Sequence, residues 1–195
     1  MFQKNEPIRE DLRYPLMVKL ANTDNSIGIS NNSVVSSLKE LKEQVAHLLE
    51  KYNRPVLIEE YIEGDEVDVS IMGNEERVKV LPLSRSLFDE LPKGVWGIYP
   101  YQAKWDEGSV YSKIKVERPA KYSQKLSALI SEICLDAYNL FDCHDYARIE
   151  VRVDRNGNPY ILEINPNPSI NRDDCVPACA EMTGLNYEDF IEEVM

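Results

Sequence analysis

The segment from Tyr146 to Asn165 constrains the chain most, because its pattern fits only one local structure. Apolar and polar residues alternate over residues 146–153, which is the period of a half-buried strand. Asn156-Gly157 follows, the strongest short-range signal for a hairpin turn, and a second short strand-like segment comes after it. We therefore predict a β-hairpin over 146–165.

The register of this hairpin decides which side chains meet. If Asn156-Gly157 occupies the two turn positions, Glu150 faces Glu163 and Arg148 faces Asn165, all on one face. The other face then forms a coherent apolar core, in which Ile149 meets Ile164, Val151 meets Leu162 and Val153 meets Tyr160.

Two glutamates directly across a strand pair repel each other and normally destabilise a sheet. A cation between Glu150 and Glu163 relieves the repulsion, and Mg²⁺ prefers oxygen ligands that it shares with substrate phosphates. Alternatively, the carboxylates lie on a solvated face, where Arg148 or Arg152 offsets them. The stiff Pro-Asn-Pro exit directly behind the second strand favours the site.

The composition excludes several classes of protein. The 195 residues carry 22 basic and 34 acidic side chains, a net charge of −12, which argues against a nucleic-acid-binding or membrane-binding surface. No segment approaches the roughly 20 apolar residues of a membrane span. The four cysteines match no zinc or redox motif, so we expect plain buried or half-buried thiols and a cytoplasmic location.

The other predicted elements alternate between strands and helices. Strands are predicted at 16–20, 56–60, 66–72 and 77–83, and amphipathic helices at 38–52 and 123–139, with two helical pieces after the hairpin. Residues 84–108 form a long irregular segment with scattered aromatics, and a loop of that length is usually functional or mobile. This order indicates an α+β fold with mostly antiparallel sheets and flanking helices. We expect two lobes, 1–84 and 85–195, with a ligand cleft between them.

Alternation and helical spacing also predict which side chains are buried. In the strand 66–72, Val67, Val69 and Ile71 face inward, whereas Glu66, Asp68 and Ser70 face outward. In the helix 123–139 one apolar side is predicted, made of Leu126, Leu129, Ile130, Ile133 and Ala137.

Four ordered segments resemble the ATP-grasp superfamily, specifically its D-alanine–D-alanine ligase-like branch. They read LMVKL…SIGIS, VLIEEYIEGDEV, ARIEVRV and YILEINPNPS, and the match runs from about Tyr14 to the C-terminus. No single segment is decisive, but the ordered set is specific. The resemblance implies an ATP-grasp fold in which the lobe 1–84 carries a phosphate loop and an adenine hinge. The lobe 85–195 then carries the metal-binding hairpin, and the nucleotide cleft lies between the lobes.

Carried over residue by residue, the resemblance implies a set of ATP-binding residues. These are Lys19 and Lys104 for the phosphates, Ser26 and Gly28 in a phosphate loop at 25–29, Glu59, Glu60, Tyr61 and Ile62 at the adenine hinge, and Glu66 for the ribose. Backbone N–H groups of such a loop can cradle phosphate oxygens.

The resemblance also implies residues for the metal and for the reacting groups. Glu150, Glu163 and Asn165 are similar to Mg²⁺ ligands, with two ions expected and Mn²⁺ as an alternative metal. Arg148 is similar to the arginine near the transferred phosphate and acyl group. Ser169 stands at a glycine position whose backbone helps to form an oxyanion hole.

The ATP-binding residues have simpler alternatives. Lys19 could extend from its apolar strand to the surface, and Lys104 could make a cation–π contact. Glu59 and Glu60 could be ordinary edge-strand charges, and the loop 21–32 could be a plain exposed turn.

The implied chemistry is ATP-dependent ligation of a carboxylate to an amine or a thiol through an acyl phosphate. In such a reaction Mg²⁺, Lys and Arg neutralise charge and hold the groups in line. The expected ligands are therefore ATP, a small carboxylate and an amine acceptor. Asp173 and Asp174 lie where the resemblance places the carboxylate of a second D-alanine, so D-alanine is not the expected acceptor.

The chain begins just before the strand of Lys19, whereas family members carry a further N-terminal α/β domain. We expect a fragment, an isolated domain or one part of a split system, completed by that domain or by a partner chain. A homodimer is also open. The rival hypothesis is a non-catalytic nucleotide-binding module that regulates or scaffolds a partner, and a third, weaker one is carboxylation of the biotin carboxylase type.

Overall fold

The computed structural model describes residues 8–9, 11–106 and 108–194, with the backbone alone for Lys104 and Trp105. The chain forms two compact units. The first unit comprises Met1–Ile62 and Phe88–Ile114, and the second comprises Glu63–Leu87 and Lys115–Met195. Within the described residues, no helix is long and apolar enough to cross a membrane.

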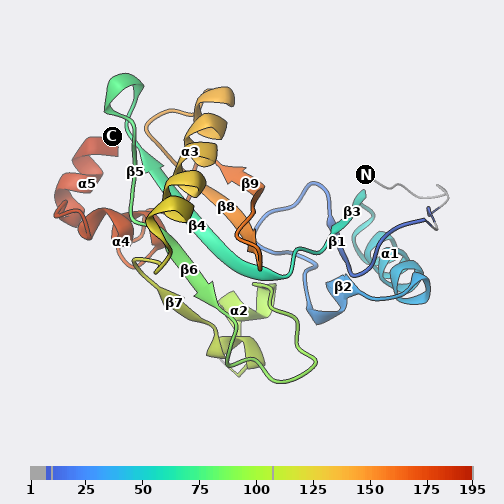
Figure 1. Cartoon of the computed structure of the whole chain (residues 1–195). Coiled ribbons are helices and arrows are strands. Elements are labelled where there is room, and N and C mark those ends of the chain that lie inside the picture. The colour runs from blue at the N-terminus through green and yellow to red at the C-terminus, as the bar shows by residue number, and fades with distance from the viewer. Residues whose placement is uncertain (1–7, 10, 107, 195) are drawn as a thin grey trace. The chain divides into compact units, whose positions relative to one another are not determined.

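The first unit contains an antiparallel sheet covered by one helix (Figure 1). The strands are β1 (Leu16–Leu20), β2 (Val34–Val35) and β3 (Val56–Glu60), in the order β2-β1-β3. The helix α1 (Leu38–Tyr52) follows the predicted bounds and buries Leu41, Val45 and Leu48 on the sheet. It begins at Ser37, whose hydroxyl accepts the N–H of Glu40 as the capping signal predicts.

Short helical turns complete the first unit. They are η1 (Asn31–Ser33), α2 (Tyr101–Trp105) and η3 (Val110–Lys113). The side chain of Asn31 connects η1 with the loop at 94–96 and with η3. Its Oδ1 accepts from the Trp96 amide at 2.8 Å and from the Tyr111 hydroxyl at 3.0 Å, and its Nδ2 donates to the Gly94 carbonyl at 3.3 Å.

The second unit is built on a six-stranded antiparallel sheet in the order β7-β6-β4-β8-β9, with β5 paired to β4. Its strands are β4 (Gly64–Met72), β5 (Lys79–Val80), β6 (Ser84–Leu87), β7 (Lys115–Glu117), β8 (Tyr146–Asp154) and β9 (Pro159–Asn165). The turn η2 (Glu75–Arg77) lies between β4 and β5.

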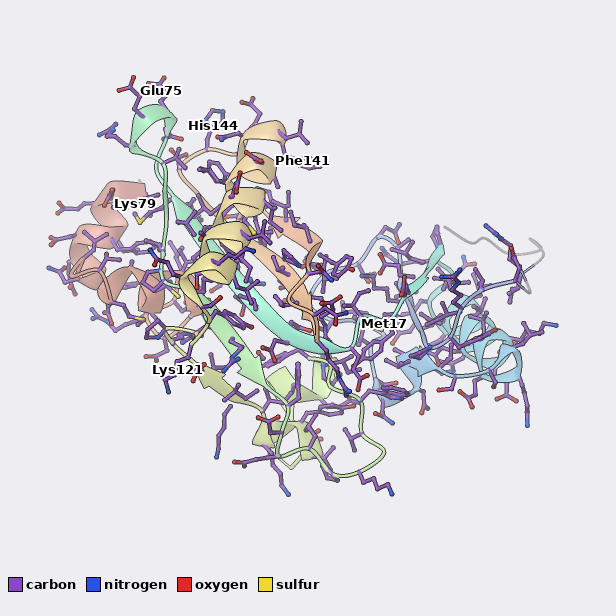
Figure 2. The ribbon with its side chains drawn as sticks, in the orientation of Figure 1. Met17, Glu75, Lys79, Lys121, Phe141 and His144 are labelled. Carbon is purple, nitrogen blue, oxygen red and sulfur yellow. The ribbon has the colours of Figure 1, made fainter. Side chains whose placement is uncertain are left out.

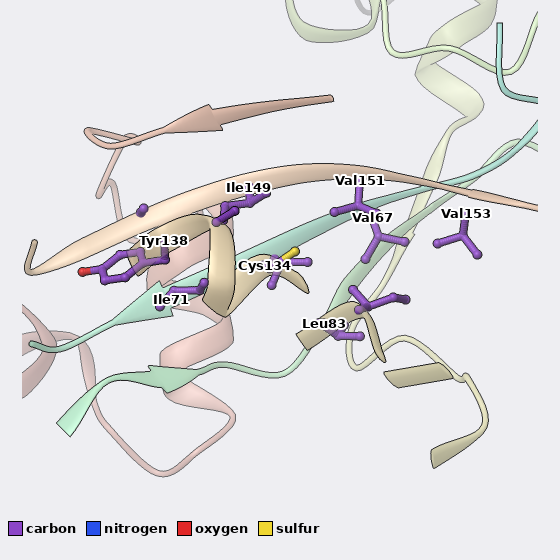
Figure 3. Close-up of a cluster of buried hydrophobic side chains, with 12 residues drawn as sticks. Val67, Ile71, Leu83, Cys134, Tyr138, Ile149, Val151 and Val153 are labelled. Atoms are coloured by element: carbon purple, nitrogen blue, oxygen red, sulfur yellow. The ribbon is translucent and has the colours of Figure 1, made fainter. Parts of the chain in front are cut away.

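The two central strands, β4 and β8, pair along their whole length, from Gly64 opposite Asp154 to Met72 opposite Tyr146. The helix α3 (Gln124–Leu140) covers one face of this pair and buries Ile130, Cys134 and Tyr138 there (Figure 3). From the sheet, the same core receives Val67, Val69, Ile71, Ile149, Val151 and Val153, as alternation predicts.

The helices α4 (Cys175–Glu181) and α5 (Tyr187–Val194) form a further core with Met72 of β4, on the other face of the sheet. Ser70 is fully buried there beside Cys175. Ser70 lies on the predicted face of the sheet. It is not exposed as predicted, because α4 covers that end of β4.

The predicted α+β architecture is confirmed, and three details are corrected. The boundary at 84/85 does not separate the two units, because β4 pairs along its whole length with β8 and so belongs with the hairpin. The predicted strand 77–83 is reduced to β5, and β6 falls inside the segment predicted to be irregular. Leu129 is 38% exposed instead of buried, and Phe141, beyond the end of α3, also projects into solvent (Figure 2).

The hairpin has the predicted partners near the site but a different turn. The amide of Asp154 donates to the carbonyl of Asn158 at 3.0 Å, so three residues form the loop, and Gly157 takes a φ of +82°. Val153 therefore pairs with Pro159 and Val151 with Ile161, not with Tyr160 and Leu162 as predicted. A β-bulge then shifts the register between Glu150 and Val151 and restores the predicted pairs of Glu150 with Glu163 and Arg148 with Asn165.

Gly64 marks a close approach of β4 to β8. A Cβ at this position would lie 2.0 Å from the backbone oxygen of Val153. We expect Gly64→Ala to lower the free energy of unfolding by about 3 kcal/mol or more, because the strands must separate or overpack. Urea unfolding followed by circular dichroism measures the change.

The matched control is Gly184→Ala in the same unit. Gly184 has a φ of +91°, and no neighbouring atom lies within 4 Å of the place that a Cβ would take, so only backbone strain of about 1 kcal/mol is expected. Equal losses for the two variants would contradict the close approach.

Candidate functional site

One face of the β4-β8-β9 sheet carries rows of polar side chains at directly paired positions. Asp68, Glu150 and Glu163 form one row of carboxylates across the three strands. The adjacent row consists of Ser70, Arg148 and Asn165, and on the other side Glu66 pairs with Arg152. We call these eight residues the polar face. The predicted meeting of Arg148, Glu150, Glu163 and Asn165 on one face is confirmed.

Arg148 lies between two of the carboxylates. Its Nη2 is 2.9 Å from Glu150 Oε1, and its Nε is 3.5 Å from Asp68 Oδ1. All three side chains are between 21% and 30% exposed, so solvent and small ions can reach them. Ion pairs with this partial burial are stronger than fully exposed pairs, because water screens them less.

Asp68 is the carboxylate with the most strongly perturbed environment on the polar face. Burial raises the pKa of Asp68 well above its usual range, and the negative charges of Cys175 and Glu150 act in the same direction. The Arg148 guanidinium opposes them by lowering the pKa of Asp68. A cation close to this row would therefore stabilise the ionised form.

Glu66, the residue expected to bind ribose, is held by an arginine. Its carboxylate lies 3.1 Å from Nη2 of Arg152, whose Nη1 donates to the Gly64 carbonyl at 2.9 Å. Arg152 is only 4% exposed and Glu66 is 16% exposed at its side chain. The pair fixes the end of β4 from which the polar face begins.

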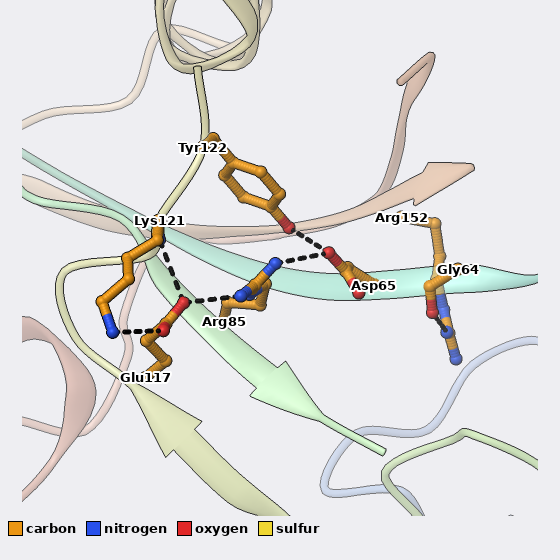
Figure 4. Close-up of polar contacts among 7 residues, drawn as sticks. All are labelled: Gly64, Asp65, Arg85, Glu117, Lys121, Tyr122 and Arg152. Atoms are coloured by element: carbon orange, nitrogen blue, oxygen red, sulfur yellow. Dashed lines mark hydrogen bonds and ion pairs between the residues drawn. The ribbon is translucent and has the colours of Figure 1, made fainter. Parts of the chain in front are cut away.

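The opposite face of β4 and the neighbouring strands β6 and β7 carry a separate network around Arg85 (Figure 4). Arg85 pairs with Asp65 at 3.1 Å and with Glu117 at 2.7 Å, and its guanidinium lies over the ring of Tyr122. The Tyr122 hydroxyl donates to Asp65 at 2.8 Å, and burial raises the pKa of that phenol. This network connects β4, β6 and β7 to the start of α3.

The donor set on the polar face fits a divalent cation that is shared with phosphates. Glu150 and Glu163 stand opposite each other and supply carboxylates, and Asn165 adds a carboxamide next to Glu163 on the same face. Hard cations such as Mg²⁺ take such oxygen ligands and complete their shell with water and phosphate. In the described part of the chain, no three His, Cys, Asp or Glu side chains form a metal site by themselves.

The segment after β9 is held by its own polar contacts. Asn165 Oδ1 accepts the amide of Asn167 at 3.0 Å, and the hydroxyl of Ser169 donates to Asp174. Asp174 stands directly before α4. Ser169 itself is exposed.

In the first unit, Lys19 and Glu59 form an ion pair. Nζ of Lys19 lies 2.7 Å from Oε2 of Glu59, with 20% of the lysine side chain exposed. The two residues come from the neighbouring strands β1 and β3, in which Met17 is the direct partner of Glu59. Glu59 is thus a partner of Lys19 in this structure, and Lys19 does not extend freely into solvent.

The predicted phosphate loop is a series of tight turns. Asn25, Ser26 and Gly28 have positive φ angles, and the amides of Ile27 and Ile29 donate to carbonyls within the loop. A Cβ on Gly28 would lie 3.3 Å from Leu20 and Leu48, so this glycine allows the loop to pack against α1. The Ser26 hydroxyl donates to the Tyr99 carbonyl at 3.1 Å.

At the predicted adenine hinge, Glu60 is the last residue of β3 and Tyr61 follows it directly. The amide of Tyr61 donates to the Pro15 carbonyl at 3.1 Å, its hydroxyl donates to Gly97, and its ring packs edge-on against Trp96. Ile62 is half-buried and is the last residue of this part of the first unit. Lys104 lies in α2, and its side chain is outside the described part of the structure.

Sequence reasoning missed two charged residues of the polar face. Asp68 was predicted only as an outward residue, although cross-strand pairing of β4 with β8 places it opposite Glu150. Arg152 was considered only as a surface charge. The signal available for both was the alternation, but the pairing of strands that are far apart in sequence could not be read from it.

A sequence model of the family described as "D-ala D-ala ligase C-terminus" matches residues 2–195. The chain belongs to this family. It is 31% identical over 191 residues to a D-alanine–D-alanine ligase of Acetivibrio thermocellus, covering 97% of this chain and 47% of that protein. An uncharacterized protein, y4sG, of Sinorhizobium fredii is 33% identical and is covered to 52% of its length. The chain thus spans about half the length of these relatives.

Solved structures of ligases share the fold. The D-alanine–D-alanine ligase from Bacillus anthracis complexed with ATP superposes with a TM-score of 0.75 at 22% identity, covering 99% of this chain and 56% of that one. VanG D-Ala:D-Ser ligase from Enterococcus faecalis gives a TM-score of 0.74 at 20% identity, covering 94% of this chain and 49% of that one. The expected ATP-grasp fold is therefore confirmed.

The pair of Arg152 with Glu66 can be tested by its contribution to stability. We expect Arg152→Met to lower the free energy of unfolding by about 3 kcal/mol, because the Glu66 carboxylate is left buried without its cation. The double variant with Glu66→Gln should recover most of the loss. Urea unfolding of the single and double variants measures the coupling.

Arg155→Met serves as the control at the hairpin turn. Arg155 pairs with Glu63 at 2.6 Å, but both side chains are more than half exposed, so a loss below about 1 kcal/mol is expected. Similar losses for Arg152→Met and Arg155→Met would contradict the special role of the buried pair.

Proposed function

We propose that this chain is the ATP-binding region of an ATP- and Mg²⁺-dependent carboxylate–amine, or carboxylate–thiol, ligase. The observation that supports the proposal most is the pairing of Glu150 opposite Glu163 with Arg148 opposite Asn165 on one accessible face. Two facing carboxylates destabilise a sheet, and a cation between them would relieve the repulsion that Arg148 offsets in part through its 2.9 Å contact with Glu150. Membership of a ligase family adds support to the identity of that cation and of its nucleotide.

In this proposal the residues of the polar face have distinct roles. Glu150, Glu163 and Asn165 hold Mg²⁺, with two ions expected and Mn²⁺ as an alternative, and bound Mg²⁺ supplies charge neutralisation for the phosphates. Arg148 stabilises the negative charge that develops on the transferred phosphoryl group. Glu66 orients the ribose, and its pairing with Arg152 holds the carboxylate in one place.

The residues of the first unit would bind the rest of the nucleotide. Lys19 and Lys104 neutralise phosphate charge, with Glu59 orienting Lys19 through the 2.7 Å ion pair. The turns at Ser26 and Gly28 contribute to a phosphate loop, and the segment Glu60–Ile62 accommodates the adenine. Such positioning supplies most of the catalysis in phosphoryl transfer.

The proposed reaction has two steps. An oxygen of the substrate carboxylate attacks the γ-phosphorus of ATP, the bond to the β–γ bridging oxygen breaks, and an acyl phosphate and ADP form. An amine nitrogen then attacks the acyl carbon, phosphate leaves, and the amine loses a proton, which gives an amide. The backbone at Ser169 would stabilise the oxyanion of the second step.

We propose that the acceptor is not D-alanine. Asp173 and Asp174 lie close after Ser169, and a carboxylate-bearing acceptor there would meet two negative charges. Asp174 also accepts the hydroxyl of Ser169, which ties the acidic side chain to the residue expected near the acyl group. An acceptor with a neutral or cationic group in this place fits better.

The second candidate function is a non-catalytic ATP-binding module that acts on a partner. The observation that bears on it is that the chain spans about half the length of the relatives it matches, so the match does not carry over their whole activity. Homodimerisation is open in both cases. For either function we propose a cytoplasmic location, where ATP is available and the four free thiols stay reduced.

Glu163→Gln tests the metal site. We expect it to weaken Mg²⁺-dependent binding of a fluorescent ATP analogue by at least about 100-fold, because a direct ligand should matter more than an outer-shell partner. The free energy of unfolding should stay constant or rise by up to about 1 kcal/mol, because the repulsion with Glu150 is removed. Glu63→Gln, at an exposed pair outside the site, is the control and should bind normally.

One result would contradict the proposed site, and two others would distinguish the two candidate functions. Normal binding of the Mg²⁺–analogue by Glu163→Gln, together with a sharp loss of stability, would contradict the site. Release of phosphate that depends on an added carboxylate supports a ligase. Tight ATP binding without such release across a broad panel of amino acids and other carboxylates supports the binding module.

A further inference from the structure

The Arg148 guanidinium is the shared partner of two carboxylates that face each other. Asp68 on β4 is the direct cross-strand neighbour of Glu150 on β8. Glu150 holds the guanidinium with a hydrogen bond of 2.9 Å from Nη2, whereas Asp68 Oδ1 lies 3.5 Å from Nε. The arginine is therefore bound to Glu150, with Asp68 just beyond hydrogen-bonding distance.

The Nε group of Arg148 is a buried donor without a hydrogen-bond partner among the described residues. Leaving a buried donor unpaired is costly, so such groups normally find an acceptor. Asp68 is a carboxylate at 3.5 Å from this atom, and a small rotation of either side chain would complete the bond. Asp68 is thus a second acceptor available to the guanidinium, although in this structure it forms no hydrogen bond with Nε.

Glu150 cannot bind Arg148 and a divalent cation equally well at the same time. Both partners are positively charged, so an arginine on this carboxylate would repel a metal ion that binds there. If Arg148 stayed on Glu150, the positive charge of the arginine would oppose the metal. If it moved away without a new partner, a partly buried guanidinium would be left uncompensated, which is strongly unfavourable.

We propose that Asp68 is a positioning residue that receives the Arg148 guanidinium when Glu150 turns to a divalent cation. The inference rests on the proposed function, because that function places the cation at Glu150 and Glu163. Asp68 frees Glu150 as a ligand and keeps the arginine on the polar face, next to the phosphate that it is proposed to stabilise. In the row Asp68–Glu150–Glu163, Asp68 then binds the guanidinium, while Glu150 and Glu163 share the divalent cation.

A simpler effect must be separated from this one. Removing the charge of Asp68 would also weaken cation binding through space, without any part played by Arg148. The two explanations differ when the guanidinium is replaced. Arg148→Lys keeps the positive charge but lacks the Nε–H donor and the planar fork that bind a carboxylate with two hydrogen bonds.

The test uses the full chain and measures the Mg²⁺ concentration that half-saturates binding of a fluorescent, non-hydrolysable ATP analogue. Asp68→Asn should raise this concentration about tenfold, as for the loss of an outer-shell partner. Asp68→Glu keeps the carboxylate, so its half-saturating Mg²⁺ concentration should lie between those of Asp68→Asn and the wild type. Asp65→Asn is the matched control, because it removes a carboxylate from the same strand on the opposite face, and should stay within about twofold of the wild type.

The double-mutant cycle decides the mechanism. In the Arg148→Lys background, Asp68→Asn should change the half-saturating Mg²⁺ concentration by less than about twofold. A second readout is the ¹⁵N resonance of Arg148 Nε, assigned by its loss in Arg148→Lys. This signal should show a hydrogen bond on addition of Mg²⁺ and analogue in the wild type, and not in Asp68→Asn.

Wild-type Mg²⁺ dependence in Asp68→Asn would overturn the inference and leave the proposed function intact. A loss that persists at full size in the Arg148→Lys background, with an unchanged Nε resonance, would also overturn it in favour of a through-space effect. Failure of the wild-type chain to bind the analogue at any Mg²⁺ concentration would instead refute the proposed function.

Discussion

The antiparallel pairing of β4 with β8 is the interaction on which the second unit depends. The strands pair from end to end, and successive side chains along each strand point to opposite faces. One alternating set of residues therefore faces α3, and the residues between them face the other side of the sheet. One face receives the apolar core around Val69 and Ile149, and the other receives the paired acids and arginines. A slip of one residue would exchange the two faces, so the core itself fixes the geometry of the site.

Local signals in the sequence were sufficient for elements whose stabilising contacts are near in sequence. The helix α1 has its predicted bounds, because Ser37 caps it and its apolar stripe is regular. The strand β6 was missed, because its four residues are stabilised by pairing with β4 and β7 and not by a pattern of their own. Leu129 was misassigned because helical spacing gives a direction, not the width of the surface that the helix covers.

The candidate site shows the same division. The facing pair of Glu150 and Glu163 could be predicted, because it lies within one hairpin. Asp68 and Arg152 could not, since their positions depend on a strand about eighty residues away in the chain. Ion pairs such as Lys19 with Glu59 depend on rotamers and on diagonal neighbours, which alternation does not specify.

The bulge in β9 couples the length of the hairpin loop to the position of Glu163 on the strand. The loop between Asp154 and Asn158 is one residue longer than a two-residue turn, and the unpaired residue of the bulge absorbs that difference before the strand reaches Glu163. An insertion or deletion of one residue in the loop would therefore rotate the metal-binding end of β9 out of place, unless a second change of length removed the bulge. We therefore expect changes of length in this hairpin to occur in compensated pairs, whereas Val151 and Val153, between the loop and the bulge, should stay apolar because they lie in the core.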